Sequence, residues 1–335
     1  MYIQRFAALV GTIACTTAAQ AQDQDQSGFA WEGSVELGFE SVYSSDTPAN
    51  ETDTAYAKGE FLGTYAFGNG VSIFAGLTFE EVEDAAANTG YGLYLDQLGL
   101  EFGIGPATVQ LGKVHPAFGT AWDEAAGYFG STLAEDYELS EQIGALTDLD
   151  LGVAGVLSIG LFYADDTALS QSAGFNRGRN STALGGAGNT GRLDNASLQW
   201  HGTFGDTRVW AGARHLSAGA GDVSDETGGF LAIGHTFGGA LDLFAEAAVF
   251  DGYGGTADNA RFVTLNAAYA VGDVTLSGTV ATRDVDSLGK TELLSIGAEY
   301  EFGDRYLIGA ALARIEEAGV TDHVFGVNFE IALGS

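Results

Sequence analysis

The feature that most constrains this chain is a two-residue alternation of apolar and polar side chains, repeated along most of its length. In residues 292–302, Leu294 and Ile296 lie on one face of the pattern, whereas Glu299 and Glu301 lie on the other. Successive side chains of a β-strand point to opposite faces, so this period predicts a strand and not a helix. A Gly-Asp turn and a second alternating run follow, which together predict a hairpin.

The same pattern recurs along the chain in segments of about ten residues, the length at which a tilted strand crosses the hydrocarbon core of a bilayer. We count sixteen such segments. The predicted strands are 29–43, 55–66, 71–82, 91–102, 107–114, 143–149, 156–164, 194–204, 207–217, 229–237, 240–250, 261–270, 274–283, 292–302, a run starting at 306, and 322–333.

The connections between these segments alternate between short and long. Short turns are predicted at 68–70, 103–106, 150–155, 205–206, 238–239, 272–273 and 303–304. Longer loops are predicted at 44–53, 83–90, 115–141, 165–192, 218–228, 251–260, 284–290 and 316–321. This alternation predicts an antiparallel meander with its turns at one rim and its loops at the other, as in outer-membrane barrels.

A sheet of this kind must close into a barrel if it is to span a bilayer. Every backbone N–H and C=O in a bilayer needs an internal partner, so a spanning sheet must have no free edge. An even number of strands closes an antiparallel sheet and leaves both termini on the side of the short turns. The sequence therefore predicts an all-β fold, a 16-stranded antiparallel transmembrane β-barrel. Aromatic residues beside the short turns predict a girdle at the membrane–water boundary: Phe67, Phe102, Phe204, Phe237 and Phe302.

A soluble β-protein such as a propeller or a β-helix is the alternative fold. Its alternating apolar face would have to pack a core of large side chains. The apolar faces here carry many small residues, among them Ala55, Ala57, Gly59 and Gly63. Such a face makes a poor soluble core, but it is compatible with lipid or with another subunit.

Charge and composition exclude several classes of function. The chain has 335 residues, with 13 Lys and Arg against 45 Asp and Glu, and a formal net charge of −32. A nucleic-acid-binding protein needs a basic surface to meet phosphates, so we expect no nucleic-acid partner. The body of the chain has no run of roughly 18 apolar residues, which argues against a helical membrane span.

The first residues have the features of an export signal. Arg5 is followed by an apolar run and then by Ala19-Gln20-Ala21, an A-x-A cleavage pattern. We therefore expect residues 1–21 to be a signal peptide and residues 22–335 to form a single barrel domain. The only Cys, Cys15, lies in the signal segment, so the mature chain would contain no disulfide.

The segment 93–130, LYLDQLGLEFGIGPATVQLGKVHPAFGTAWDEAAGYFG, resembles a characteristic part of the general (diffusion) porins of Gram-negative outer membranes. A strand ends at Phe102-Gly103, the next ends at Leu111-Gly112-Lys113, and a Pro/Phe/Gly stretch opens the third loop. The resemblance implies an outer-membrane location, contact with lipid and lipopolysaccharide, passive passage of small polar solutes, and a homotrimer. One departure is the end of the chain, where Ser335 stands in place of the family's usual aromatic residue.

The same resemblance implies that the third loop, 115–141, folds into the lumen and narrows it. Selectivity would then depend on charged side chains at this constriction. The loop contributes acids, and strand parity places bases on the facing wall, too few to balance the acids. We therefore expect a cation-preferring pore, whereas a merely solvated acidic surface loop is the alternative. The predicted constriction residues are Asp123, Glu124, Glu135, Asp136, Glu138, Lys58, Arg208 and Arg214.

Other functions have weaker support in the sequence. The five His residues show no HExxH pattern, and no G-x-S-x-G is present, so we expect no enzyme. We expect no cofactor beyond loosely bound Ca²⁺ or Mg²⁺ on carboxylates. Two alternatives to a general porin stay open: a substrate-selective channel on the same fold, and a structural or adhesive surface barrel with a blocked lumen.

Overall fold

The computed structural model describes residues 27–82, 90–173 and 176–334. The predicted signal segment, 1–21, and most of the predicted loop 83–90 lie outside the described residues. All sixteen predicted strands are present. They are β1 (Gly28–Ser45), β2 (Asp53–Gly68), β3 (Val71–Val82), β4 (Gly90–Ile104), β5 (Ala107–Val114), β6 (Gln142–Asp150), β7 (Val156–Ala164), β8 (Asn195–Phe204), β9 (Thr207–Leu216), β10 (Glu226–Phe237), β11 (Leu241–Asp251), β12 (Asn259–Val271), β13 (Val274–Val285), β14 (Gly289–Phe302), β15 (Tyr306–Glu317) and β16 (Val320–Gly334).

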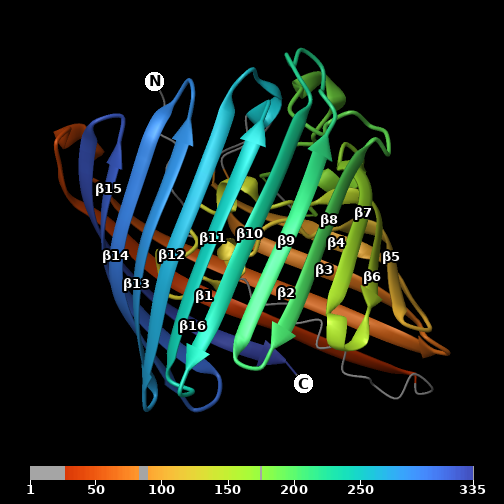
Figure 1. The fold of residues 1–335 in the computed structure, drawn as a ribbon, viewed down its shortest axis with the longest axis horizontal. Coiled ribbons are helices and arrows are strands. Elements are labelled where there is room, and N and C mark those ends of the chain that lie inside the picture. The colour runs from red at the N-terminus through yellow and green to blue at the C-terminus, as the bar shows by residue number, and fades with distance from the viewer. Residues whose placement is uncertain (1–26, 83–89, 174–175, 335) are drawn as a thin grey trace.

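The strands form one closed antiparallel barrel (Figure 1). Each strand pairs with its neighbours in sequence, and β16 pairs with β1 to close the sheet, with Leu37 opposite Phe329. Closure gives the backbone groups of both terminal strands partners that an open sheet would lack. The predicted fold class is confirmed, and the soluble propeller and β-helix alternatives are wrong.

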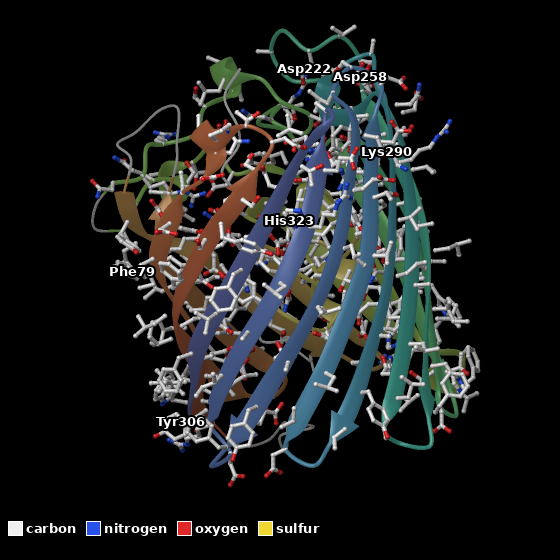
Figure 2. The ribbon with its side chains drawn as sticks, turned by 90° about the vertical axis from the view of Figure 1, so that its left-hand side faces the viewer. Phe79, Asp222, Asp258, Lys290, Tyr306 and His323 are labelled. Atoms are coloured by element: carbon white, nitrogen blue, oxygen red, sulfur yellow. The ribbon has the colours of Figure 1, made fainter. Side chains whose placement is uncertain are left out.

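The alternation places apolar side chains on the outside of the barrel. Leu294 and Ile296 on β14 are 53% and 63% exposed, whereas their neighbours Leu293 and Ser295 are buried. Figure 2 shows Phe79 and Tyr306 on the outer side of the wall. A surface with this much exposed apolar area on every side is typical of contact with lipid. Among the described helices, none is long and apolar enough to cross a membrane.

The aromatic residues predicted beside the short turns lie at the rim of the barrel that those turns form. Phe67, Phe204 and Phe237 are about half exposed. Phe302 on β14 stacks on Tyr306 of β15, and Tyr306 stacks on Phe329 of β16. These rings form a ladder across the last three strands, where amphipathic aromatic side chains suit a membrane–water boundary.

The predicted alternation of short and long connections is wrong in the last part of the barrel. The connection between β13 and β14 is only residues 286–288, and that between β15 and β16 is only Ala318-Gly319. The polar residues read as loops, such as Lys290 and Glu316, belong to strands, because backbone pairing continues past the apolar belt whatever the side chain. The difference between the two rims instead comes mainly from the loops 115–141 and 165–194.

Candidate pore constriction

The third loop leaves the wall after β5, which is only eight residues long, and returns at β6. It contains the short helix α1 (Ala121–Glu124) and the 3-10 helix η2 (Glu135–Tyr137). In Figure 1 this yellow segment lies between the front and back strands of the barrel. Its hydrogen bonds reach β2 on one side, through Tyr128, and β11 on the other, through Tyr137.

Aromatic packing holds much of the loop against the wall formed by β10 to β12. Phe118 packs edge-on against Phe230, and Tyr137 packs against Phe250 and Phe262. All five rings are at most 4% exposed. Sequence reasoning missed this cluster. Its signal was the loss of alternation in 240–250, where the face opposite Leu243 and Val249 also carries large apolar residues.

A second apolar cluster fixes the middle of the loop against the last strands. Tyr128, Phe129 and Leu133 pack on a wall of mostly small or aliphatic side chains. The loop therefore has an apolar side that faces the barrel wall. The wall residues of this cluster are Ala281, Leu293, Ala311, Ala313, Ile315 and Val324.

Polar contacts fix the ends of the packed region. The Glu246 carboxylate on β11 accepts hydrogen bonds from the Thr120 backbone N–H at 2.8 Å and from the Tyr137 hydroxyl. The Asn266 side chain on β12 donates to the Ala126 carbonyl at 2.8 Å and accepts from the Ala126 N–H at 3.1 Å. Wall side chains thus satisfy loop backbone groups that are shielded from water.

The structure places two of the predicted bases in contact with the loop. Arg214 is 6% exposed, pairs with Glu226 at 2.7 Å and donates to the Tyr137 carbonyl at 2.5 Å. Its guanidinium lies 4.6 Å from the ring centres of both Phe118 and Phe250. This enclosed cation helps to hold the third loop against the wall, through cation–π contacts and an ion pair. We call this contact region the first anchor of the loop.

Arg208 and Arg283 also pair with loop acids. Arg208 lies 3.1 Å from the Glu124 carboxylate and 3.0 Å from that of Asp242. Arg283 lies 2.6 Å from Asp136. The predicted residues Glu124 and Asp136 are therefore brought together with bases, as partners in ion pairs. The predicted base Lys58 lies 2.7 Å from Glu60, on its own strand.

The other three predicted acids, Asp123, Glu135 and Glu138, have no ion pair among the described residues. Burial raises the pKa of Asp123 to about 6, and the nearby charges of Glu124 and Glu138 add to this shift. Burial also raises the pKa of Glu135 to about 8, although a hydrogen bond from Ser131 opposes the shift. Burial, which disfavours the charged form of a carboxyl, is the main cause of both shifts, and the neighbouring acids add to it.

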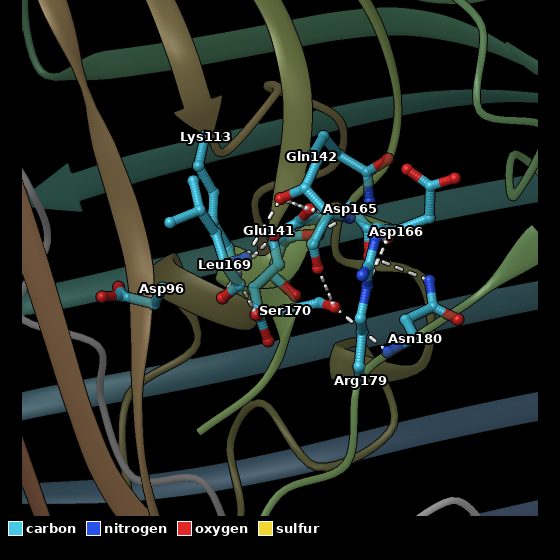
Figure 3. Close-up of polar contacts among 12 residues, drawn as sticks. Asp96, Lys113, Glu141, Gln142, Asp165, Asp166, Leu169, Ser170, Arg179 and Asn180 are labelled. Atoms are coloured by element: carbon cyan, nitrogen blue, oxygen red, sulfur yellow. Dashed lines mark hydrogen bonds and ion pairs between the residues drawn. The ribbon is translucent and has the colours of Figure 1, made fainter. Parts of the chain in front are cut away.

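A second anchor holds the two ends of the loop together (Figure 3). The Lys113 ammonium, at the end of β5, is fully buried and lies 2.7 Å from Glu141 and 3.0 Å from Asp165. Glu141 also accepts two hydrogen bonds from Arg177, whose guanidinium covers the Tyr94 ring at 3.8 Å. The loop 165–194 therefore contributes to the base of the third loop, a connection that strand parity alone could not predict.

Comparisons with known proteins agree with this architecture. No family model and no curated protein matches the sequence. Among solved structures, an anion-selective porin from Comamonas acidovorans superposes with a TM-score of 0.62 at 14% identity, covering 92% of this chain and all of that one. A mutant of the Rh. blastica porin gives 0.60 at 15% identity, with 91% and 100% coverage. The chain has the outer-membrane porin fold.

The outer-membrane channel DcaP of Acinetobacter baumannii has the same porin fold, with a TM-score of 0.62 at 12% identity, 92% coverage of this chain and 97% of that one. A closed barrel with an apolar outer face is the architecture of outer-membrane proteins, in agreement with the predicted location. Among the described residues, no group of three or more His, Cys, Asp and Glu could hold a metal ion. Loosely bound Ca²⁺ or Mg²⁺ stays a prediction.

The second anchor, formed by Lys113, Glu141 and Arg177, can be tested with Arg177→Met. We expect it to lower the free energy of unfolding by about 2 kcal/mol, because the change removes two charge-assisted hydrogen bonds and leaves Glu141 underpaired. The measurement is urea unfolding in lipid vesicles, followed by tryptophan fluorescence.

Arg192→Met is the matched control, because Arg192 lies in the same loop but its side chain is 77% exposed in its ion pair with Asp194. We expect its effect to stay within about 0.5 kcal/mol. Equal effects of the two changes would contradict the anchor.

Proposed function

We propose that the protein is an outer-membrane porin of a Gram-negative cell that lets small polar solutes and ions diffuse passively, with a preference for cations. The observation that carries the preference is the charge balance of the inward-facing groups. Six described bases on the wall and loops each lie within 3.1 Å of a carboxylate. Several inward acids have no ion pair among the described residues: Asp123, Glu135, Glu138, Glu299 and Glu330.

The third loop is the proposed constriction. Its contacts with strands on different sides of the wall support a path across the lumen, and its apolar packing against β10 to β16 supports a passage on the remaining side. The acids Asp123 and Glu138 would border that passage. Fixed negative charge in a narrow, poorly solvated channel concentrates cations and repels anions.

The fold alone does not determine ion preference. The Comamonas acidovorans porin has the same fold and is anion-selective. We therefore base cation preference on the lining charges of this chain and not on the resemblance. The apolar packing of the third loop also makes a blocked surface barrel a second candidate, which conductance measurements separate from a porin.

The test of the proposed function is the zero-current potential across a planar bilayer with an approximately tenfold KCl gradient. A perfectly cation-selective pore would give about 59 mV, and we expect a large fraction of this value with the sign of cation flow. The opposite sign would refute the cation preference. The absence of conductance would support the blocked barrel, and saturation of flux by one solute would support a substrate-selective channel.

The loop carboxyls predict a pH dependence. Their pKa values of about 6 for Asp123 and about 8 for Glu135 mean that each gains negative charge as the pH rises through that value. We expect the ratio of K⁺ to Cl⁻ permeability to rise between about pH 5 and pH 9, by about twofold for each charge gained.

Glu135→Gln should remove the upper part of this rise and keep the lower part. Glu51→Gln, in the exposed loop 46–52, serves as the control and should behave like the unmodified protein. Identical pH profiles for both variants would contradict a role for Glu135 in the passage.

We also propose a homotrimer, in contact with lipid and lipopolysaccharide at its free outer surface. The small outward side chains of β2, including Ala57, would allow close approach of a second barrel. Ala57→Trp should shift the detergent-extracted protein from trimer to monomer in light scattering after gel filtration. Ala247→Trp, on the outward face of β11, should leave the trimer intact. A monomeric unmodified protein would refute the proposal.

A further inference from the structure

A cavity of about 320 Å³ lies at the end of the barrel that carries the long loops, between the base of the third loop and the loop 165–194. The second anchor forms one side of this cavity. Its volume falls within the range of sites for small molecules, roughly 300–1,000 Å³. Figure 3 shows several of its lining residues close together: Gln142 at the start of β6, Asp165 just after β7, and Ser170 and Asn180 of the loop.

The charged groups around the cavity balance one another. The Lys113 ammonium contacts two of the lining acids, at 2.7 Å from the Glu141 carboxylate and 3.0 Å from that of Asp165. The Arg177 guanidinium, which also lines the cavity, donates two hydrogen bonds to Glu141. Two bases therefore face two acids, although the chain as a whole has a formal net charge of −32. A cavity without net charge attracts neither cations nor anions, so it favours an uncharged solute.

Several polar groups of the cavity have unused hydrogen-bonding capacity. The Gln142 side chain donates to the Ser140 carbonyl at 2.7 Å, but its oxygen and the Ser140 hydroxyl have no hydrogen-bond partner among the described residues. Arg177 uses two of its five N–H groups on Glu141. Leu184, which is 58% exposed, adds an apolar edge. The cavity therefore offers donors, acceptors and an apolar edge within one small volume.

We propose that this cavity is a binding site for an uncharged polyhydroxy solute of the size of a single sugar ring. Sugar hydroxyls both donate and accept hydrogen bonds, so they match the free groups of Ser140, Gln142 and Arg177. The C–H groups of a sugar ring are apolar, and they would pack against Leu184 while the polar groups fix the orientation of the ring. The proposal concerns binding at the loop end of the barrel, and its tests need no conductance.

The first test is a titration of the detergent-solubilised barrel with glucose, followed by saturation-transfer NMR. We expect saturable binding that is at least about tenfold weaker in the double variant Ser140→Ala with Gln142→Leu, because two neutral hydrogen bonds are lost. The matched control is Ser181→Ala with Gln171→Leu, since both residues are exposed in the loop 165–194 and neither lines the cavity. Heat-dependent mobility in detergent gels identifies the folded barrel in each variant. Equal affinities of the two double variants, or no saturable binding to the unmodified protein, would overturn the proposal.

The charge balance of the cavity is tested with two sugars that share the ring of glucose. Glucosamine carries an ammonium at about pH 6, and glucuronate carries a carboxylate. We expect both to bind at least about threefold more weakly than glucose, because each brings a charge into a place where the protein charges are already paired. Equal or tighter binding of either charged sugar would overturn the assignment of an uncharged ligand.

The last test places the bound sugar in the cavity. Because the only Cys, Cys15, lies in the predicted signal segment, Leu184→Cys can carry a single trifluoroethyl label for ¹⁹F NMR. We expect glucose to shift this resonance with the same half-saturation as in the titration. Leu193→Cys is the control, because Leu193 is 61% exposed in the same loop and does not line the cavity. Equal shifts at both positions, or none at Leu184→Cys, would overturn the location of the site.

Discussion

The structure depends on the pairing of β16 with β1. In a solvent that cannot hydrogen-bond to the backbone, every strand needs two partners, and this last ladder supplies them for the ends of the sheet. The register sets Leu37 against Phe329 and Glu36 against Glu330. One pairing therefore joins the apolar outer faces and, at the same time, brings acids from the two ends of the chain together on the inner face.

Closure also reverses the usual distribution of side chains. Large apolar residues such as Ile296 lie outside, while charged residues such as Lys113 and Arg214 are buried inside. A charge in such a place must be paired or hydrogen-bonded. Most of the inward bases meet this requirement by pairing with carboxylates where the third loop meets the wall. Their charges are therefore already paired and do not balance further acids. In the chain as a whole, 45 Asp and Glu outnumber 13 Lys and Arg.

The two sides of the third loop have different roles. Phe118 and Tyr137 fix one side against aromatic wall residues, and the packing gives the loop a defined position. The loop also carries Glu135 and Glu138, whose charges interact with that of Lys58 on β2.

The sequence by itself determined the strands, their order and which face of each meets lipid, because a two-residue period survives in every segment and needs only local geometry. It also placed Lys58, Arg208 and Arg214 on the inner face. It misjudged the connections at 284–290 and 316–321, since polar side chains do not end a strand whose backbone stays paired. Only the tertiary structure decided the partners: Arg214 with Glu226 and the third loop, Arg177 with Glu141, and Arg283 with Asp136. Those contacts join residues far apart in sequence, and closure of the barrel and the path of the third loop bring them together.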